Sequence, residues 1–127
     1  MPIIFIKSLP PANLGTIPEM ISEIRASGAK ALRCPESNVW VVFQPVQPAY
    51  YVQADDPAIY PNDKTHPPLI LVKAQSGRSM ADKEAFVRAV ATAVAHGLSI
   101  SSKNVWIHYE EMQPQDIWFD GRWTQRF

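Results

Sequence analysis

The chain has 127 residues, enough for one domain with a substantial hydrophobic core. Its 12 lysines and arginines balance 12 aspartates and glutamates, and since no basic run occurs, a nucleic-acid partner is disfavoured. The single cysteine excludes an internal disulfide, and no cluster of cysteines and histidines has metal-ligand spacing. No apolar run is long enough for a membrane span or a secretory signal, so we expect a cytoplasmic protein without a membrane partner.

The first predicted element is a short apolar strand from Ile3 to Ser8, directly after Met1 and Pro2. Because small residues after the initiator methionine permit its removal, we expect Pro2 to become the N-terminus. A terminal proline is a secondary amine, and desolvation would lower its pKa towards neutrality, as proton abstraction near pH 7 requires. The alternative is that Pro2 only begins an edge strand, where proline is tolerated.

A helix is predicted to begin at residues 16–19. Thr16 and Glu19 have the spacing of a capping box, and Pro18 suits a first helical turn. An apolar stripe follows, formed by Met20, Ile21 and Ile24. The next strand is expected from Val39 to Phe43, and the proline-rich stretch after it is interpreted as a linker with His66 on its surface.

The second half of the chain repeats the first. When the chain is shifted without gaps, Pro2 falls on Pro68, and residues 38–41 (Asn-Val-Trp-Val) fall on 104–107 (Asn-Val-Trp-Ile). The repeat predicts a strand from Leu69 to Ala74, a helix opened by Ser79 and Asp82 and ending near Gly97, and a strand from Val105 to Glu110. We therefore predict a single domain over 1–127, built from pseudo-repeats 2–61 and 68–127.

A strand–helix–strand unit places its two strands parallel. Two such units predict an α/β (α+β) fold, in which a four-stranded sheet carries two helices on one face. Because the strands are apolar nearly throughout, the other face must be covered as well. We expect subunits to pack sheet against sheet in a ring, which makes the protein a homo-oligomer.

The two copies differ most at Ser76-Gly77-Arg78-Ser79, where the first copy has Pro10-Pro11-Ala12-Asn13. Arg78 comes just before a predicted helix, where backbone N–H groups and the helix dipole favour anions. A guanidinium group binds a carboxylate through two parallel hydrogen bonds. We interpret Arg78 as a carboxylate clamp, and the alternative is a solvated loop arginine. Arg33 and Lys73 are further cationic candidates.

On the last predicted strand, Trp106 and His108 point to one face. Histidine side chains can gain or lose a proton near pH 7, so His108 could share a proton with a substrate or orient a water molecule. The alternative is a hydrogen-bonded structural histidine. Trp106 has a counterpart in Trp40, which favours a core position, although a pocket wall is also compatible.

Pro2, Gly77-Arg78-Ser79 and the segment from Asn104 to Met112 together resemble the tautomerase superfamily. The two fused units are similar to macrophage migration inhibitory factor, the 5-carboxymethyl-2-hydroxymuconate isomerases and the cis-3-chloroacrylic acid dehalogenases. The resemblance implies a catalytic Pro2, a substrate-binding Arg78, a homotrimer and no metal or organic cofactor. It also implies an aromatic wall from the tail, for which Trp118 and Phe119 are the candidates; an interface plug is the compatible alternative.

The chain differs from members of this family in the number of arginines near the predicted site. The dehalogenases have a second arginine where this chain has Gln75, which disfavours a site that needs two carboxylate clamps. We therefore predict a tautomerase, an isomerase in which neutral Pro2 moves a proton on a small 2-oxo acid while Arg78 holds the carboxylate. One alternative is a hydratase, dehalogenase or decarboxylase of small acids, with Pro2 as acid and His108 placing water. The other is a binding protein of the macrophage migration inhibitory factor type.

Overall fold

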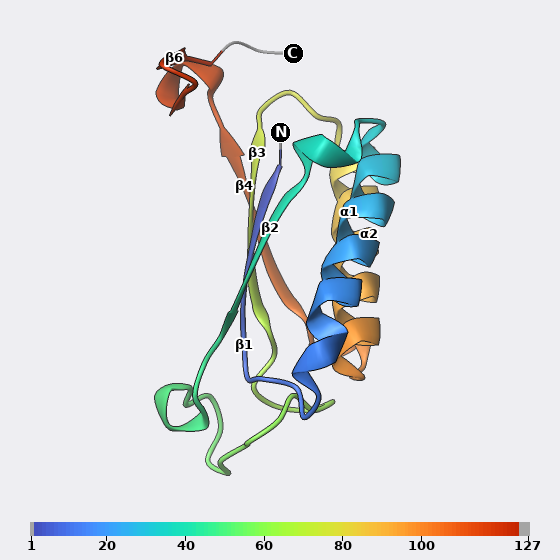
Figure 1. The fold of residues 1–127 in the computed structure, drawn as a ribbon, viewed down its shortest axis with the longest axis vertical. Coiled ribbons are helices and arrows are strands. Elements are labelled where there is room, and N and C mark those ends of the chain that lie inside the picture. The colour runs from blue at the N-terminus through green and yellow to red at the C-terminus, as the bar shows by residue number, and fades with distance from the viewer. Residues whose placement is uncertain (1, 125–127) are drawn as a thin grey trace.

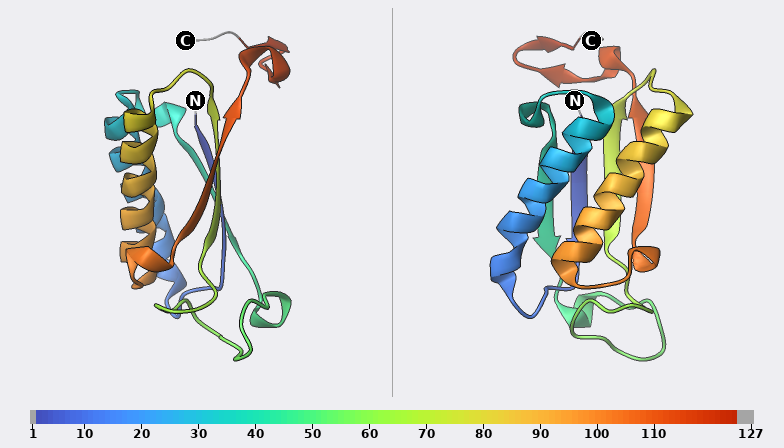
Figure 2. Two further views of the ribbon diagram at one scale, coloured as in Figure 1. Left: turned by 180° about the vertical axis from the view of Figure 1, so that it is seen from behind. Right: turned by 90° about the vertical axis from the view of Figure 1, so that its right-hand side faces the viewer.

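The computed structural model describes residues 2–124 and consists of a sheet covered on one face by a helix pair (Figure 1). Strands β1 (Ile3–Ser8), β2 (Trp40–Pro45), β3 (Leu69–Gln75) and β4 (Trp106–Met112) form a sheet in the order β2-β1-β3-β4. Helices α1 (Ile17–Leu32) and α2 (Met80–Leu98) lie side by side on it (Figure 2). The predicted fold of two β-α-β units is confirmed.

The sheet is mixed because each unit pairs its own strands in parallel while the two units meet antiparallel. β1 runs parallel to β2, β3 runs parallel to β4, and β1 is antiparallel to β3. Pro2 and Pro68 occupy equivalent places: the Pro2 carbonyl accepts the Trp40 N–H at 3.0 Å, and the Pro68 carbonyl accepts the Trp106 N–H at 3.2 Å. The repeat is thus visible in the backbone, whereas the boundaries predicted for its two copies stay predictions.

The hydrophobic core lies between the sheet and the helices. Alternate residues of β1 enter it, because side chains along a strand point to opposite faces, so Ile4 and Ile6 are buried while Phe5 and Lys7 are exposed. Burying each large aliphatic or aromatic side chain contributes roughly 1.5–3 kcal/mol. The largest contributions from the other elements come from Ile70, Val72, Met20, Ile24, Phe86, Val90 and Val94.

The two helices begin differently. Ser79 caps α2 as predicted, since its hydroxyl oxygen accepts the Asp82 N–H at 3.1 Å. The capping box predicted at Thr16 is wrong: its hydroxyl, as donor, lies 3.1 Å from the Asn13 carbonyl oxygen and 3.2 Å from that of Gly97. A short 3₁₀ turn precedes α1, so Thr16 already has helical backbone angles and cannot act as its cap.

Gly97 lies inside the last turn of α2, and the helix continues to Leu98. The left-handed residue that ends it is Ser99, with φ of 57°. Gly97 faces α1, and a Cβ atom there would lie 2.4 Å from the Cγ of the buried Met20. The predicted end of this helix near Gly97 is confirmed to within one residue, and the glycine also permits close packing of the two helices.

The segment between the two units is packed against the body of the protein. The predicted surface position of His66 is wrong, because His66 is only 2% exposed. Its Nδ1 lies 3.0 Å from the Thr65 hydroxyl oxygen, and its ring meets that of Tyr51 edge to face at 5.1 Å. The Tyr51 hydroxyl donates to the Pro67 carbonyl at 2.6 Å. These contacts hold the segment against the start of β3.

The sheet face opposite the helices is open in the single chain. Large apolar side chains on it remain substantially exposed: Phe5, Trp40, Val42, Leu69 and Trp106. After β4, strands β5 (Trp118–Phe119) and β6 (Arg122–Trp123) form a separate hairpin beyond one end of the sheet, on the side away from the helices (Figure 1). Within residues 2–124, none of the helices is both long and apolar enough to span a bilayer. Oligomerisation through the open face stays a prediction.

Candidate active site

A pocket of about 530 Å³ lies at the edge of the sheet where β3 ends, between the last turn of α1 and the first turn of α2. Its walls include Leu32, Arg33, Asn38, Gln75, Arg78 and Asp82. No group of three or more histidine, cysteine, aspartate or glutamate side chains in residues 2–124 is placed to hold a metal ion. The charged side chains that line the pocket are two arginines and one aspartate.

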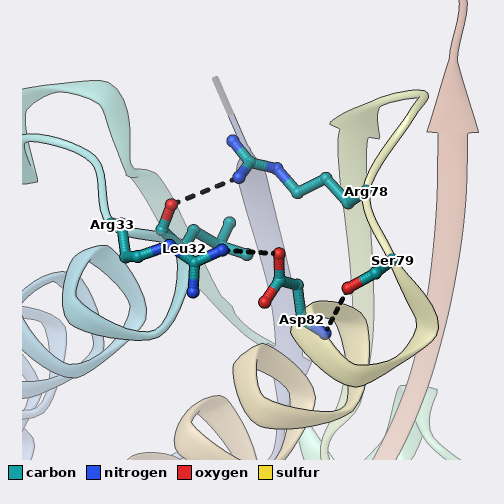
Figure 3. A network of polar contacts seen from close by, with 5 residues as sticks. All are labelled: Leu32, Arg33, Arg78, Ser79 and Asp82. Atoms are coloured by element: carbon teal, nitrogen blue, oxygen red, sulfur yellow. Dashed lines mark hydrogen bonds and ion pairs between the residues drawn. The ribbon is translucent and has the colours of Figure 1, made fainter.

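Arg78 enters the pocket from the turn that joins β3 to α2. The turn depends on Gly77, whose φ of 105° is rarely adopted by residues with a side chain. The Gly77 N–H donates to Glu111 at 3.3 Å, and the other carboxylate oxygen of Glu111 pairs with Lys83 at 2.7 Å. Glu111 thus ties the turn to β4 and to α2. Arg78 then extends across the pocket and donates to the Leu32 carbonyl at 3.2 Å (Figure 3).

A second guanidinium group reaches the same pocket from the end of α1. Arg33 ends that helix in the left-handed conformation, with φ of 55°. Its Nη2 pairs with the Asp82 carboxylate at 2.9 Å, as Figure 3 shows. Arg78, by contrast, has no carboxylate partner among residues 2–124. The structure therefore brings two of the candidate cations together, one paired and one available.

Pro2 is buried at the same edge of the sheet. The antiparallel register pairs Ile3 with Lys73, so Pro2 lies opposite Ala74, one residue before Gln75 of the pocket wall. The bond from its carbonyl to the Trp40 N–H fixes Pro2 in the sheet. Met1 lies outside the described residues, and its removal stays a prediction.

The structure does not bring His108 and Trp106 into this pocket. Both lie on the open face of β4, with ring centroids 6.1 Å apart. Trp106 is 52% exposed, so the core position favoured for it is wrong for the single chain. Trp106 and its counterpart Trp40 both lie on the sheet face that the helices leave open. The repeat shows that the two positions are equivalent, but it does not show which face of the sheet is covered.

The two tail aromatics lie on the β5–β6 hairpin. The Phe119 ring contacts that of Trp40 edge to face at 5.4 Å, whereas Trp118 packs on Trp123 at 5.3 Å. Trp40 pairs with Ile3 in the β1–β2 ladder, so Phe119 lies near the strand that begins with Pro2. Neither aromatic lines the pocket of the single chain. Their role as a wall stays a prediction.

Tyr109 is a residue near the site that the sequence did not single out. Its hydroxyl is buried and has no hydrogen-bond partner within the described chain. Burial raises the pKa of the Tyr109 phenol, against the opposing effect of the Arg78 and Lys83 charges. The Lys83 ammonium group lies 5.4 Å from the ring centroid. The alternation along β4 could place Tyr109 beneath the helices, but its proximity to Arg78 depends on the tertiary fold.

The chain is similar in structure, but not in sequence, to known proteins. No protein-family model matches the sequence, and no curated protein matches it. Among solved structures, Pt0534 inactivated by 2-oxo-3-pentynoate superposes with a TM-score of 0.83, at 12% identity, over 96% of this chain and 94% of that one. A symmetric trimer of wild-type fused 4-OT gives 0.81 at 15% identity, over 96% and 94%. Malonate semialdehyde decarboxylase gives 0.72 at 18% identity, over 94% and 91%.

These neighbours are members of the tautomerase superfamily, with more than one activity among them. At such low identity the likeness shows the fold alone. The resemblance found at Pro2, Gly77-Arg78-Ser79 and the last strand is confirmed to that extent. The chain has the fold of the tautomerase superfamily, in the long form made of two fused β-α-β units.

Proposed function

We propose that this chain is a cofactor-independent isomerase that moves a proton on a small 2-oxo acid. Pro2 acts as the general base and Arg78 anchors the carboxylate. The observation that carries this proposal is the β1–β3 register, which sets Pro2 beside the end of the strand that leads into Arg78. A base and an anion-binding group at one edge of a sheet are the two parts that this reaction needs.

Arg78 is suited to hold the carboxylate. Its Nη1 is engaged by the Leu32 carbonyl, which orients the side chain and leaves the other guanidinium N–H groups for a ligand. Its position before the first turn of α2 adds the favourable field of a helix N-terminus. The same charge stabilises the enolate that develops when a proton leaves the carbon next to the carbonyl.

Pro2 is the proposed base once Met1 is removed. Pro2 is buried at the start of β1, and burial disfavours the charged form of an amine, so we propose that its free amine is neutral and able to accept a proton near pH 7. The amine takes the proton from one carbon or from an enol oxygen and returns it at another carbon. The atoms of the substrate are rearranged without loss, so no cofactor is consumed.

The open face of the sheet supports a homotrimer, since fused 4-OT forms a trimer on this fold. We propose that Trp106, His108, Trp118 and Phe119 act at subunit boundaries, where a neighbouring chain could present them to the pocket as substrate-binding residues. The partner of the pocket is a small carboxylate, and neither nucleic acid nor membrane is required. A hydratase or dehalogenase with His108 placing water receives no support from the single chain, because His108 is on the other side of the sheet.

The test is Pro2→Ala, with intact-protein mass confirming that Met1 is absent from both proteins. The variant keeps an N-terminal amine but loses the rigid secondary amine of proline, so kcat/KM with phenylenolpyruvate should fall by about 10²-fold, the lower end of what a positioned general base contributes. Pro68→Ala is the matched control, because Pro68 has the same ladder bond but an internal amide nitrogen. If Pro2→Ala keeps the wild-type activity, the proposal is wrong. It is also wrong if Pro68→Ala loses as much activity as Pro2→Ala while both variants remain folded.

The pH profile separates the isomerase from an acid-dependent reaction on the same scaffold. With Pro2 as a base, kcat/KM rises with pH as the amine loses its proton. With Pro2 as an acid, as a hydratase would require, kcat/KM falls over the same range. A falling limb assigned to Pro2 would therefore replace the isomerase with that alternative.

A further inference from the structure

We propose that Asp82, through its ion pair with Arg33, makes the pocket selective for substrates that carry a single carboxylate. Asp82 is then the specificity-determining residue of the site. This inference rests on the proposed function, because it takes Arg78 as the anchor for the first carboxylate. It limits the number of carboxylates that the substrate carries, and it gives a role to Asp82 and Arg33, which the proposed reaction does not use.

The ion pair joins the first turn of α2, which carries Asp82, to the end of α1, which carries Arg33. Asp82 lies in the first turn of α2, where the helix dipole stabilises a carboxylate, and its backbone N–H is bound by the Ser79 hydroxyl at 3.1 Å. Its side chain is 23% exposed, against 72% for that of Arg33, which reaches it from the end of α1 at 2.9 Å (Figure 3). The carboxylate is thus the more buried member of the pair, and the guanidinium is the more exposed one.

The charges of the pocket wall leave room for one anionic group. Two arginines and one aspartate sum to a net charge of one positive unit, because Asp82 already neutralises Arg33. Gln75, which is 8% exposed on the same wall, adds a neutral amide in place of a further cation. A monocarboxylate bound to Arg78 therefore balances the site.

A second carboxylate on the substrate would meet Asp82 or would have to displace it from Arg33. Either arrangement brings two negative charges near each other at the mouth of the pocket. For like charges about 5 Å apart, the repulsion corresponds to about a fourfold change in affinity in bulk water and to a larger change near a protein surface, where the effective dielectric constant is lower; we therefore expect about tenfold. Removing the Asp82 charge should relieve that repulsion and free Arg33 to hold the second carboxylate.

The experiment compares two ligands of equal chain length, 2-oxopentanoate and 2-oxoglutarate, which differ in one carboxylate. Their dissociation constants are measured by isothermal titration calorimetry at low salt, so the result does not depend on turnover. The wild-type protein should prefer 2-oxopentanoate. Asp82→Asn should shift the ratio of the two constants by about tenfold towards 2-oxoglutarate. The shift should be smaller in Asp82→Asn/Arg33→Gln, which relieves the same repulsion but lacks the freed cation.

Three further variants make the result specific. Glu84→Gln removes a carboxylate two residues along α2 that pairs with Arg88 at 3.1 Å, outside the pocket, and it should leave the ratio unchanged. Arg33→Gln alone should weaken 2-oxoglutarate more than 2-oxopentanoate, which gives a second reading if Asp82→Asn does not fold. Arg78→Gln should weaken both ligands.

The outcomes separate this inference from the function on which it rests. An unchanged ratio in Asp82→Asn, together with loss of both ligands in Arg78→Gln, overturns the selectivity and leaves the anchor in place. If Arg78→Gln binds both ligands as tightly as the wild type, Arg78 is not the carboxylate anchor, and the selectivity argument fails with it. The same conclusion follows if the wild-type protein binds neither ligand. A shift in Asp82→Asn that keeps its full size when Arg33 is also replaced contradicts the role given to Arg33.

Discussion

Removal of the Tyr109 hydroxyl should stabilise the protein. This hydroxyl is buried with no hydrogen-bond partner within the described chain, and leaving such a group unsatisfied costs about 1–3 kcal/mol. Tyr109→Phe keeps the ring and its contact with Lys83. Because the residue as a whole is only half-buried, we expect the lower end of that range, a gain of about 1 kcal/mol in the free energy of unfolding.

Tyr51→Phe is the matched control. Its hydroxyl donates to the Pro67 carbonyl at 2.6 Å, so the same chemical change removes a formed hydrogen bond and should cost about 1 kcal/mol. Both variants are compared with the wild type by urea unfolding at pH 7 and one fixed protein concentration, since association shifts apparent stability. If Tyr109→Phe loses as much stability as Tyr51→Phe, the hydroxyl has a partner and the reasoning is refuted.

Three other predictions concern the helices and the response to alkali. Gly97→Ala should lower the free energy of unfolding by about 1–2 kcal/mol despite the better helix propensity of alanine, because the new Cβ meets Met20; thermal melts should show a smaller loss when Met20 is first changed to alanine. Ser79→Ala should cost about 1 kcal/mol in urea unfolding through loss of the helix cap, and an equal loss in Ser79→Thr, which keeps the hydroxyl, would contradict that cause. Burial raises the pKa of both Tyr51 and Tyr109, so the folded state disfavours their charged forms. Stability should be constant with respect to these groups below their unfolded pKa of about 10 and should fall as the pH rises through their folded values; a double phenylalanine variant with the same alkaline loss would exclude these phenols as its source.

Local patterns were enough to predict the fold because they report which side of each element is buried. Alternation in β1 and helical spacing in α2 gave the elements, and the repeat that maps Pro2 onto Pro68 gave their order. The reasons predicted for the helix ends were less accurate. Thr16 failed as a cap because a 3₁₀ turn precedes α1, and Gly97, one residue from the end of α2, also serves a contact with Met20, a residue distant in sequence.

The candidate site was predicted only in part, for a related reason. Arg78 could be found because it interrupts the repeat, and Pro2 because of its place in the chain. The pairing of Arg33 with Asp82 joins the end of one helix to the start of the other, and neither residue carries a local signal of it. His66 was misplaced for the same reason, since its burial depends on Tyr51 folding back over it.

The near-symmetry of the two units provides an internal reference for the site. At the opposite edge of the sheet, Ser99 has the same left-handed backbone as Arg33, with φ of 57° and 55°. Asn104 takes the place of the pocket residue Asn38, but its amide is bound by the linker carbonyls of Asn62 and Thr65 at 2.8 and 2.9 Å. The counterparts of the three charged residues are all uncharged: Ser99 for Arg33, Ala12 for Arg78 and Thr16 for Asp82.

One chain therefore contains the same left-handed helix end twice. Arg33 lies beside the pocket with two arginines, and Ser99 lies beside a smaller pocket of about 180 Å³ that is lined by Thr16 and by the carboxylates Glu19 and Glu23. With Arg78 as the proposed carboxylate anchor, each chain has one anion-binding edge, so we expect a binding stoichiometry of one ligand per chain in any ring the protein forms. Any affinity that arose from helix ends alone would be shared by both edges. A stoichiometry of one would assign recognition to the side chains that the first edge carries and the second has lost.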